Sequence, residues 1–385
     1  MRVLYVAPRY HNNQIPIMEG WLEDNNQVLF ISQIASSGED YSVLKPRVLG
    51  YSKVFDFIFK LRNYLKKCND PDAKFAISSK KGFPSYFKLK RLITQFAPDV
   101  VILRERSFYN IVAYQICKRK KIPCILYNQS PLWGSEPLNN SMLHRIVRRN
   151  MPSFRITPVM GEPKCKQLRE TNSYYVPFVI KPKMEFSVRK YCKDGILHLL
   201  CVGRYMECKN HILQLSTLKR LRLQYNNIHL TLVGEVTDDE QQKYYDGVIS
   251  YIEENDLQPY TTVRKNVSHK EVYEEYSKAD VFLLPSEEAA TIVQLEAMAC
   301  SLPVICSPFG GRNAHVRDGY NGYLVKIEEE DLAHKLEIIL RDLSCVEEMG
   351  KNSLKFIQEN CSFKNYKEQI LKVIKDINEQ PKKGM

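Results

Sequence analysis

Short apolar runs that alternate with longer helical stretches make up the first part of the chain. RVLYVAP, which ends in a proline, is followed by a helical stretch around Ile17–Asn25 and by a second run at Val28–Ser32. Two more runs, Val100–Arg104 and CILYN at 124–128, flank a helical stretch that reaches Lys121. Strands that are apolar along their whole length are typical of parallel sheets with helices on both faces. The pattern predicts a doubly wound α/β domain.

The same alternation starts again after residues 177–195, a charged stretch with two prolines that we interpret as a linker. It is carried by ILHLLCVGR, IHLTLVGE, TTVRKN, ADVFLLPS, LPVICSP and NGYLV, with helical stretches between most of them. We therefore predict an α/β protein of two Rossmann-like parallel-sheet domains, at residues 1–180 and 181–360, facing a central cleft. Residues 361–385 are predicted to form a helix and tail that cross back to the first domain.

The composition fits a globular protein, with 44% apolar and 26% charged residues in 385. No apolar run approaches the ~20 residues that cross a bilayer, and the first segment lacks the small-residue cleavage site of a signal peptide. The expected location is therefore the cytoplasm. The eleven cysteines include no Cys-x-x-Cys pair, so we expect reduced thiols rather than disulfides.

The net charge of +12 is spread unevenly along the chain. Residues 1–180 hold 28 Lys and Arg against 13 Asp and Glu, whereas residues 181–385 hold 28 against 31. Such a difference indicates that the first domain meets an anionic partner. Nucleic acid, an acidic membrane surface and a phosphorylated acceptor all fit the charge alone.

The segment 284–311 contains a strand end, a turn and a helix start. Glu287 and Glu288 lie in the predicted turn, Thr291 is a candidate N-cap, and Glu296 follows within the helix. A helix that starts after a parallel strand presents unpaired N–H groups, which suit a pyrophosphate. Carboxylates beside it can accept hydrogen bonds from sugar hydroxyls. The competing interpretation is a capped helix with two surface acids.

The segment CVGRYMECKN at 201–210 is the second candidate site. A strand ends at Gly203, and Arg204 and Lys209 follow in the loop before the next helix. Two cations at the carboxyl end of a strand can neutralise a diphosphate leaving group. The competing interpretation is a solvated basic loop.

Together these segments resemble the C-terminal domain of retaining glycosyltransferases with the GT-B fold, glycosyltransferase family 4 (glycosyl transferases group 1). The resemblance covers about residues 196–340, and it includes the family's Glu-x7-Glu element at Glu288 and Glu296. It implies that Arg204 and Lys209 hold the donor diphosphate, that Glu288 contacts the donor sugar and that Glu296 contacts the ribose. Glu288, Arg204 and Lys209 would be the catalytic residues. The implied donor-binding set is Gly203, Arg204, Lys209, Glu288, Ala289, Ala290, Thr291, Ile292, Val293 and Glu296.

The chain departs from the family pattern at several places, and two of them concern the predicted site residues. Ala289-Ala290-Thr291 stands where the family has Gly-Phe-Gly, which leaves the donor sugar open. In the first domain, Gln129 stands where the family often has a histidine, and His11 is a candidate substitute. His11 and Gln129 are therefore the acceptor-side candidates.

The resemblance implies retaining transfer of a sugar from a nucleoside-diphosphate sugar, with UDP as the expected nucleotide, to a hydroxyl. The acceptor would be a glycan or lipid-linked glycan in cell-surface polysaccharide synthesis. The nucleotide sugar is a co-substrate, and neither a cofactor nor a metal is expected. The Asp-x-Asp sequence at Asp70-Pro71-Asp72 is interpreted as a turn. A sugar-nucleotide epimerase and a non-catalytic glycan-binding protein of the same fold are the alternatives.

Aromatic and basic residues mix within Ser52–Arg91, and Arg145, Arg148 and Arg149 form another basic cluster. A basic amphipathic segment can lie in an anionic membrane interface, here the inner face of the cytoplasmic membrane. A helix packed on the first sheet with solvated lysines fits the pattern equally well. Nucleic acid is disfavoured as a partner, because no recognition motif is evident.

Overall fold

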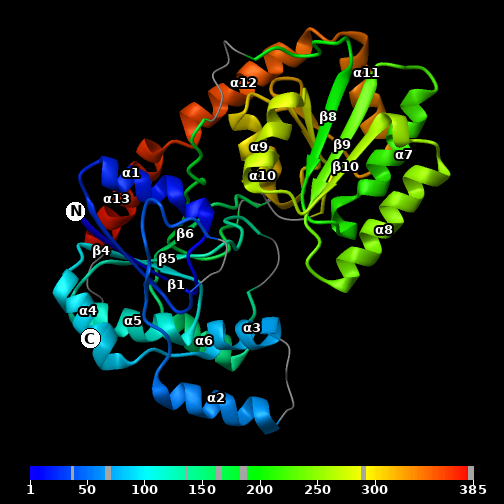
Figure 1. Cartoon of the computed structure of the whole chain (residues 1–385). Coiled ribbons are helices and arrows are strands. Elements are labelled where there is room, and N and C mark those ends of the chain that lie inside the picture. The colour runs from blue at the N-terminus through cyan, green and yellow to red at the C-terminus, as the bar shows by residue number, and fades with distance from the viewer. Residues whose placement is uncertain are drawn as a thin grey trace. The chain divides into compact units, whose positions relative to one another are not determined.

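The computed structural model describes residues 1–35, 39–65, 71–134, 138–161, 167–182, 189–287 and 292–379 (Figure 1). The chain forms two compact units. Unit 1 contains Met1–Pro158, Lys166–Val179 and Phe363–Met385, and unit 2 contains Val159–Cys165 and Ile180–Ser362. Residues 159–161, which were predicted to belong to the first domain, thus group with unit 2.

Unit 1 is built on a seven-stranded sheet in the order β3-β2-β1-β4-β5-β6-β7. Its strands are β1 (Arg2–Ala7), β2 (Gln27–Ser32), β3 (Arg47–Val48), β4 (Val100–Arg104), β5 (Cys124–Tyr127), β6 (Arg155–Thr157) and β7 (Ser173–Tyr175). All neighbours pair in parallel, with Val3 of β1 opposite Val28 on one side and Val100 on the other. The central strands are buried on both faces, as their continuous apolar sequences predicted.

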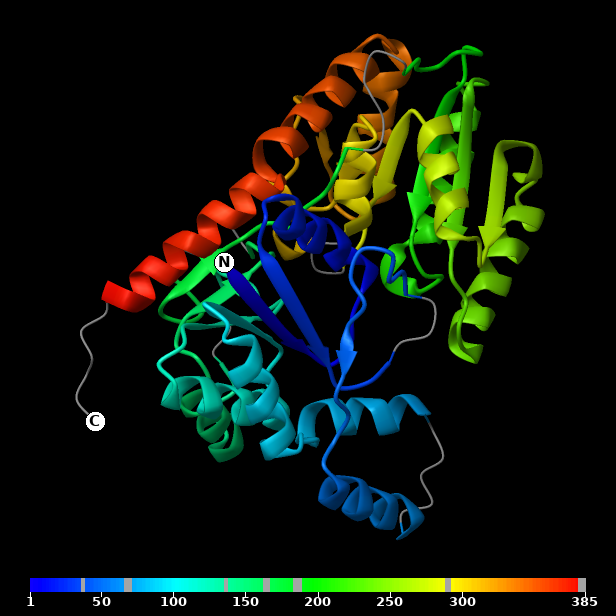
Figure 2. The ribbon, with the colours of Figure 1, turned by 60° about the vertical axis from the view of Figure 1, so that its left-hand side comes forward.

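Helices cover both faces of this sheet (Figures 1 and 2). The core on one face includes residues of α1 (Ile15–Glu23) and the last helix, α13 (Phe363–Glu379), and the core on the other includes residues of α4 (Tyr86–Phe96) and α5 (Phe108–Arg119). The indole N–H of Trp21 donates to the hydroxyl of Tyr5 at 2.8 Å, and that hydroxyl lies 3.1 Å from the hydroxyl of Tyr366. This buried contact attaches the C-terminal helix to unit 1.

Three further helices of unit 1 are α2 (Lys53–Leu65), α3 (Pro71–Lys81) and α6 (Met142–Arg149). The turn predicted around Asp70-Pro71-Asp72 is wrong for its last two residues, because Pro71 and Asp72 begin α3. Proline is favourable in the first turn of a helix, where its missing N–H has no intrahelical partner. Asp70 lies outside the described residues.

Unit 2 is built on a six-stranded parallel sheet in the order β10-β9-β8-β11-β12-β13. Its strands are β8 (Leu197–Val202), β9 (Ile228–Gly234), β10 (Thr261–Lys265), β11 (Val281–Leu284), β12 (Val304–Cys306) and β13 (Gly322–Leu324). The core on one face includes residues of α7 (His211–Arg222), α8 (Asp239–Glu254), α11 (Glu329–Arg341) and α12 (Cys345–Asn360). Phe282 points to the opposite face, where it contacts Tyr276 of α9 (His269–Lys278), and α10 (Ile292–Ala299) packs beside β11 and β12. Two doubly wound parallel sheets confirm the predicted fold class.

Within the described ranges, the structure contains no helix with the length and apolar character required to span a membrane.

Candidate functional site

A pocket of about 360 Å³ opens in unit 2 where β8 and β9 end, and we call it the strand-end pocket. The carboxyl ends of strands are the usual ligand sites of doubly wound sheets. The pocket combines two cations, two carboxylates, a histidine and an apolar wall. It is lined by Val202, Gly203, Arg204, Lys209, Val233, Gly234, Glu235, Val267, His269, Val272, Val293 and Glu296.

Two glycines allow the ends of β8 and β9 to approach each other closely. The Gly203 N–H donates to the carbonyl of Val233 at 2.9 Å. A Cβ atom on Gly234 would lie 2.3 Å from the carbonyl oxygen of Gly203, and a Cβ on Gly203 would lie 3.0 Å from Cε of Lys209. A side chain at Gly234 would therefore displace backbone at the base of the pocket.

Lys209 lies at the end of a short 3-10 turn, Glu207–Lys209, that follows β8. Two hydrogen bonds attach this loop to the segment after β11: the Asn210 amide donates to the carbonyl of Pro285 at 2.7 Å, and the Glu287 N–H donates to the carbonyl of Cys208 at 3.1 Å. Lys209 is only 4% exposed. Its ammonium group is therefore little screened by water, which strengthens its attraction for an anion.

Glu296 supplies a carboxylate to the pocket from α10. The Tyr276 hydroxyl donates to Oε2 of Glu296 at 3.4 Å, and Nε2 of His269 lies 3.8 Å from Oε1. Burial, followed by the charge of Glu296, raises the pKa of both Tyr273 and Tyr276 above the usual value, so both phenols stay protonated. The carboxylate is thus held by protein contacts and lines the pocket, where it can accept hydrogen bonds from ligand hydroxyls.

The structure brings together five residues of the predicted donor set: Gly203, Arg204, Lys209, Val293 and Glu296 all line the strand-end pocket. Ile292 is the first residue of α10 and is not among the lining residues. The predicted residues Glu288, Ala289, Ala290 and Thr291 lie outside the described residues.

Sequence reasoning missed Glu235 and His269. Glu235 directly follows β9, and His269 is the first residue of α9, four positions after β10 ends. Both therefore obey the same rule that indicated Arg204, namely that a polar residue just after a parallel strand faces the ligand edge. Applying that rule to every strand would have found them.

The acceptor-side candidates His11 and Gln129 lie in unit 1. His11 Nε2 accepts from Nε of Arg9 at 3.2 Å, and burial together with Arg104 and Arg9 lowers the pKa of His11 to about 4. His11 is therefore neutral near pH 7. It lines a hollow of about 300 Å³ with Arg9, Lys80, Arg104, Glu105 and Arg106. Gln129 is exposed just after β5.

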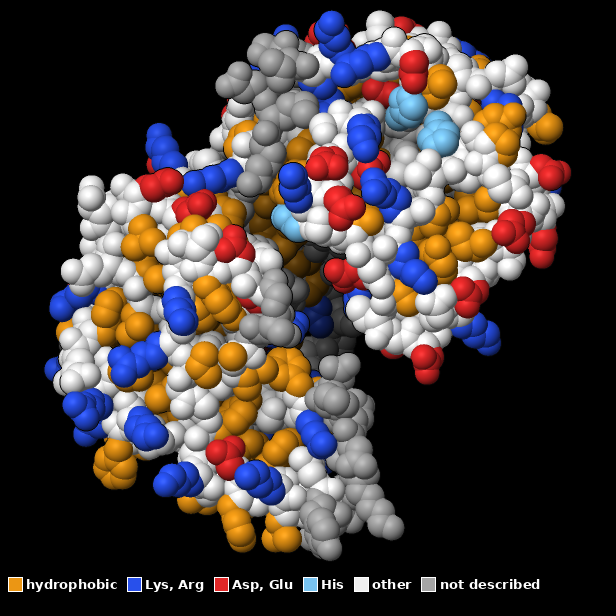
Figure 3. All heavy atoms as spheres, viewed as in Figure 1, with side chains coloured by type: hydrophobic (Ala, Val, Ile, Leu, Met, Phe, Trp, Pro, Cys, Tyr) orange, Lys and Arg blue, Asp and Glu red, His pale blue; other side chains and the backbone are white. Residues whose placement is uncertain are grey.

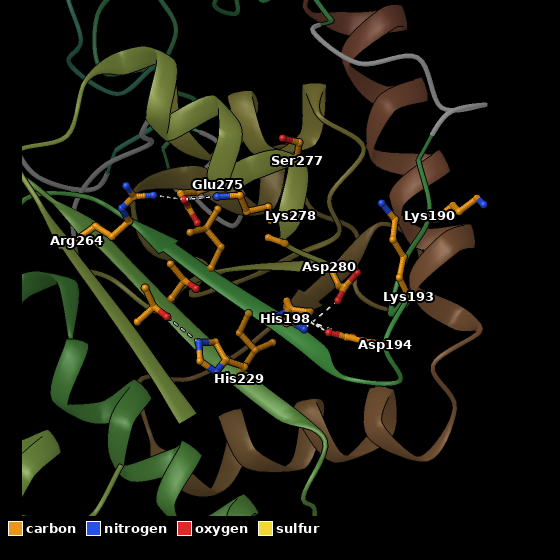
Figure 4. Close-up of a pocket in the computed structure, with 15 residues that line it drawn as sticks. Lys190, Lys193, Asp194, His198, His229, Arg264, Glu275, Ser277, Lys278 and Asp280 are labelled. Carbon is orange, nitrogen blue, oxygen red and sulfur yellow. Dashed lines mark hydrogen bonds and ion pairs between the residues drawn. The ribbon is translucent and has the colours of Figure 1, made fainter. Parts of the chain in front are cut away.

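A larger hollow of about 820 Å³ lies on the sheet of unit 2 beside α9 and contains none of the predicted site residues (Figure 4). Several of its polar groups pair with one another. Glu275 accepts from Arg264 at 2.5 Å and from Lys278 at 2.9 Å, His198 lies 3.0 Å from Asp194, and His229 lies 2.9 Å from Thr262. These mutual contacts make it a weaker candidate than the strand-end pocket, despite its size.

Solved structures define the class of this fold. A glycosyltransferase from Rickettsia africae matches with a TM-score of 0.72 and 14% identity, covering 99% of both chains. Anabaena HepE in complex with UDP-glucose matches with a TM-score of 0.67 and 12% identity, covering 98% of this chain and 100% of HepE. The two Rossmann-like domains thus form the GT-B fold of glycosyltransferases.

Sequence comparison finds similarity to one family over part of the chain. Residues 186–356 match the model of Glycosyl transferases group 1. Human alpha-1,3/1,6-mannosyltransferase ALG2 is 27% identical over 46% of this chain and 44% of its own length. Lipopolysaccharide 1,2-N-acetylglucosaminetransferase of Salmonella typhimurium is 32% identical over 32% of this chain and 34% of its own length. The chain therefore matches less than half the length of these relatives.

Proposed function

We propose that the protein is a retaining, metal-independent glycosyltransferase that moves a sugar from a nucleoside-diphosphate sugar to a hydroxyl of a glycan or lipid-linked glycan. The observation that carries the proposal is the convergence of Arg204, Lys209 and Glu296 on one pocket at the carboxyl ends of parallel strands. The match of residues 186–356 to the model of Glycosyl transferases group 1 supports the same activity. Cell-surface polysaccharide synthesis is the proposed setting.

In the proposed reaction, Arg204 and Lys209 bind the diphosphate of the donor. Negative charge grows on this group as the glycosidic bond breaks, so both cations stabilise the transition state more than the ground state. Each charge-assisted hydrogen bond contributes roughly 1.5–3 kcal/mol. The leaving phosphate accepts the proton of the acceptor hydroxyl on the same face of the sugar, and the configuration is retained without a covalent enzyme intermediate.

The acids of the site have separate proposed roles. Glu296 accepts hydrogen bonds from the ribose diol, a task that suits a fixed carboxylate lining the pocket. Glu288 contacts the donor sugar, a role that rests on the family resemblance of its position. UDP is the proposed nucleotide, and the UDP-glucose complex of HepE, which shares the fold, supports this choice.

A peripheral location on an anionic membrane is proposed for unit 1. Val54, Phe57, Ile58 and Leu61 of α2 lie on the surface with 50–70% of each side chain exposed, at the i, i+3, i+4, i+7 spacing of one helix face. Phe55 of the same helix is buried. An outward apolar stripe next to lysines is the pattern of helices that lie in a membrane interface. The proposed acceptor, a lipid-linked glycan, would be presented at such a surface.

The experiment that tests the proposal is a thermal-shift screen with UDP-, GDP- and ADP-sugars, followed by a transfer assay. We expect a UDP-sugar to raise the melting temperature, because a ligand at a hundredfold excess over its Kd stabilises the folded state by about 2.7 kcal/mol. Lys209→Ala should abolish the shift. The matched control is Lys219→Ala, an exposed lysine of α7 that donates to Asn255.

Two outcomes would contradict the proposal. A donor that is converted in the absence of any acceptor would indicate an epimerase. A protein that shows no shift with any nucleotide sugar would indicate a non-catalytic glycan-binding protein.

A further inference from the structure

A hollow of about 390 Å³ in unit 1 is lined by four arginines and one acid, and we call it the arginine pocket. The arginines are Arg106, Arg148, Arg155 and Arg169, and the acid is Glu170. They come from four separate segments: the loop after β4, helix α6, strand β6 and the segment before β7. Four guanidinium groups around one carboxylate leave a local excess of positive charge.

The carboxylate is already shared by two of the arginines. Nη2 of Arg106 lies 2.5 and 2.6 Å from the two oxygens of Glu170, and Nε of Arg155 lies 3.0 Å from Oε2. Within the described ranges, Arg148 donates to two uncharged oxygens, at 2.8 Å to the carbonyl of Asn139 and 2.7 Å to Oδ1 of Asn140. Among the described residues, neither Arg148 nor Arg169 forms an ion pair with a carboxylate.

Arg155 forms a fixed cationic wall of the pocket, because it is 1% exposed and almost all of its donors are engaged. It donates to Ser173, Asn128 and the carbonyls of Ser130 and Pro131 at 2.8–3.2 Å. Burial lowers the pKa of Arg155 to about 10, Glu170 raises it, and Arg106 and Arg169 lower it. The side chain therefore keeps its charge near neutral pH, in surroundings where the other arginines repel it.

Two arginines of the pocket each have a buried donor without an acceptor among the described residues. Nε of Arg106 and Nε of Arg169 are both buried without a hydrogen-bond partner in the described part of the chain. An unpaired buried donor is unfavourable, and an anion that reached these donors would supply an acceptor while balancing the charge. Phosphate fits best, because it carries up to two negative charges and several oxygens that match the forked geometry of guanidinium groups.

We propose that the arginine pocket binds a phosphate group, held by Arg169, Arg148 and Arg106. The phosphate is either the head group of a membrane lipid or a soluble phosphate. Helix α6 favours the lipid, since it contributes Arg148 to the pocket, buries no residue, and exposes Met142 at 73% and Leu143 at 53% on the surface. The site goes beyond the proposed glycosyl transfer and does not depend on the donor.

The test compares Arg169→Gln with Arg119→Gln in the full-length chain at physiological salt. Arg119 is a matched control, because it is an exposed arginine of unit 1 that donates only to the Tyr86 hydroxyl among the contacts that the structure shows. Binding of inorganic phosphate is measured by calorimetry, and binding of phosphatidylcholine vesicles with and without 30% phosphatidylglycerol, roughly the charge density of an anionic leaflet, is measured by flotation.

We expect Arg169→Gln to weaken binding of inorganic phosphate, of the anionic vesicles or of both at least tenfold. Arg119→Gln should change either affinity less than twofold. If Arg169→Gln weakens binding of inorganic phosphate but not of the anionic vesicles, the ligand is a soluble phosphate. If it weakens binding of the anionic vesicles, with or without an effect on inorganic phosphate, the ligand is a lipid head group. Equal losses in the two variants, or no phosphate and no vesicle binding by the parent protein, overturn the proposal. If Arg169→Gln lowers the melting temperature, Arg148→Gln provides a second variant. Unchanged affinity of Arg148→Gln for both phosphate and anionic vesicles also overturns the proposal.

Discussion

The two units share a doubly wound parallel sheet but differ in what lies at the carboxyl ends of their strands. In unit 2, the strand-end pocket combines Arg204 and Lys209 with Glu235 and Glu296. In unit 1, the hollow around His11 is lined by four cations and one acid. One scaffold thus supports two kinds of pocket, because the loops after the strands, rather than the sheet, supply the chemistry.

The surfaces differ in the same way. In Figure 3, hydrophobic and basic side chains are interspersed over the part of unit 1 that carries α2, α4 and α5, whereas acidic and basic side chains are mixed over unit 2. The sequence shows the same contrast, with 28 basic against 13 acidic residues in 1–180 and 28 against 31 in 181–385. A positive and partly apolar surface fits a membrane or a phosphorylated partner, and a mixed one fits a small ligand with both phosphates and hydroxyls.

The largest effect is expected at the cations of unit 2. Lys209→Ala should reduce turnover by roughly 10²–10³-fold, because it removes charge stabilisation of the leaving diphosphate. Steady-state kinetics with the donor identified by thermal shift measures the loss, and the melting temperature checks the fold. Lys219→Ala should retain activity. If both variants turn over at the parent rate, the assignment of the strand-end pocket as the donor site is wrong.

Glycine at 234 should be required for the stability of unit 2. Gly234→Ala places a Cβ 2.3 Å from the carbonyl oxygen of Gly203, so the backbone must shift, at a cost of about 1–3 kcal/mol. Urea denaturation measures the change in the free energy of unfolding. Gly247→Ala is the matched control, since it lies in α8 with open space around it and should stabilise the helix by about 0.5–1 kcal/mol. A neutral Gly234→Ala would show that the strand ends tolerate separation.

The apolar stripe of α2 should determine membrane binding by unit 1. The double variant Phe57→Ser/Ile58→Ser should weaken flotation with anionic vesicles at least tenfold, since burying one such side chain contributes about 1.5–3 kcal/mol. Stability should be unchanged, because both side chains are more than half exposed. Leu223→Ser, at an 86% exposed leucine of unit 2, is the control and should bind vesicles as the parent does. Equal flotation of all three proteins would argue that α2 does not contact the membrane.

The smallest expected effect is on the pH dependence of stability in unit 2. Burial, then the charge of Lys209, lowers the pKa of His211 from 6.5 to about 3. The folded state therefore binds fewer protons than the unfolded state between these values, and the free energy of unfolding falls as pH decreases below 6.5. One such histidine accounts for about 1.4 kcal/mol per pH unit in that window.

His211→Phe, which keeps a ring beside Tyr205, should therefore flatten the curve between pH 7 and pH 5.5 by about 1 kcal/mol. Chemical denaturation at several pH values measures it. His144→Gln, at an exposed histidine of α6, should leave the slope as it is. A slope that is identical in all three proteins would show that His211 is charged in the folded state.

Much of the fold followed from local pattern. The runs at Val100–Arg104 and Val28–Ser32 are buried strands, and the apolar spacing of Phe363–Asn378 corresponds to α13. The pattern was less informative for Ser52–Arg91, where a membrane helix and a packed helix fitted equally well. The structure combines features of both, because Phe55 of α2 packs inward while Phe57 faces outward. Helical periodicity shows that a helix has distinct faces, but it does not show which of them packs against the rest of the protein.

The sequence by itself determined the class of each domain, since continuous apolar strands are stable only inside a sheet covered on both sides. It also indicated the candidate cations of the proposed donor site, because residues just after parallel strands share one edge. Only the tertiary structure decided that Arg204, Lys209 and Glu296 line the same pocket, and that Arg106, Arg148, Arg155 and Arg169 surround one carboxylate. These residues are up to 92 positions apart in the first set and 63 in the second, so only packing of distant segments brings them together.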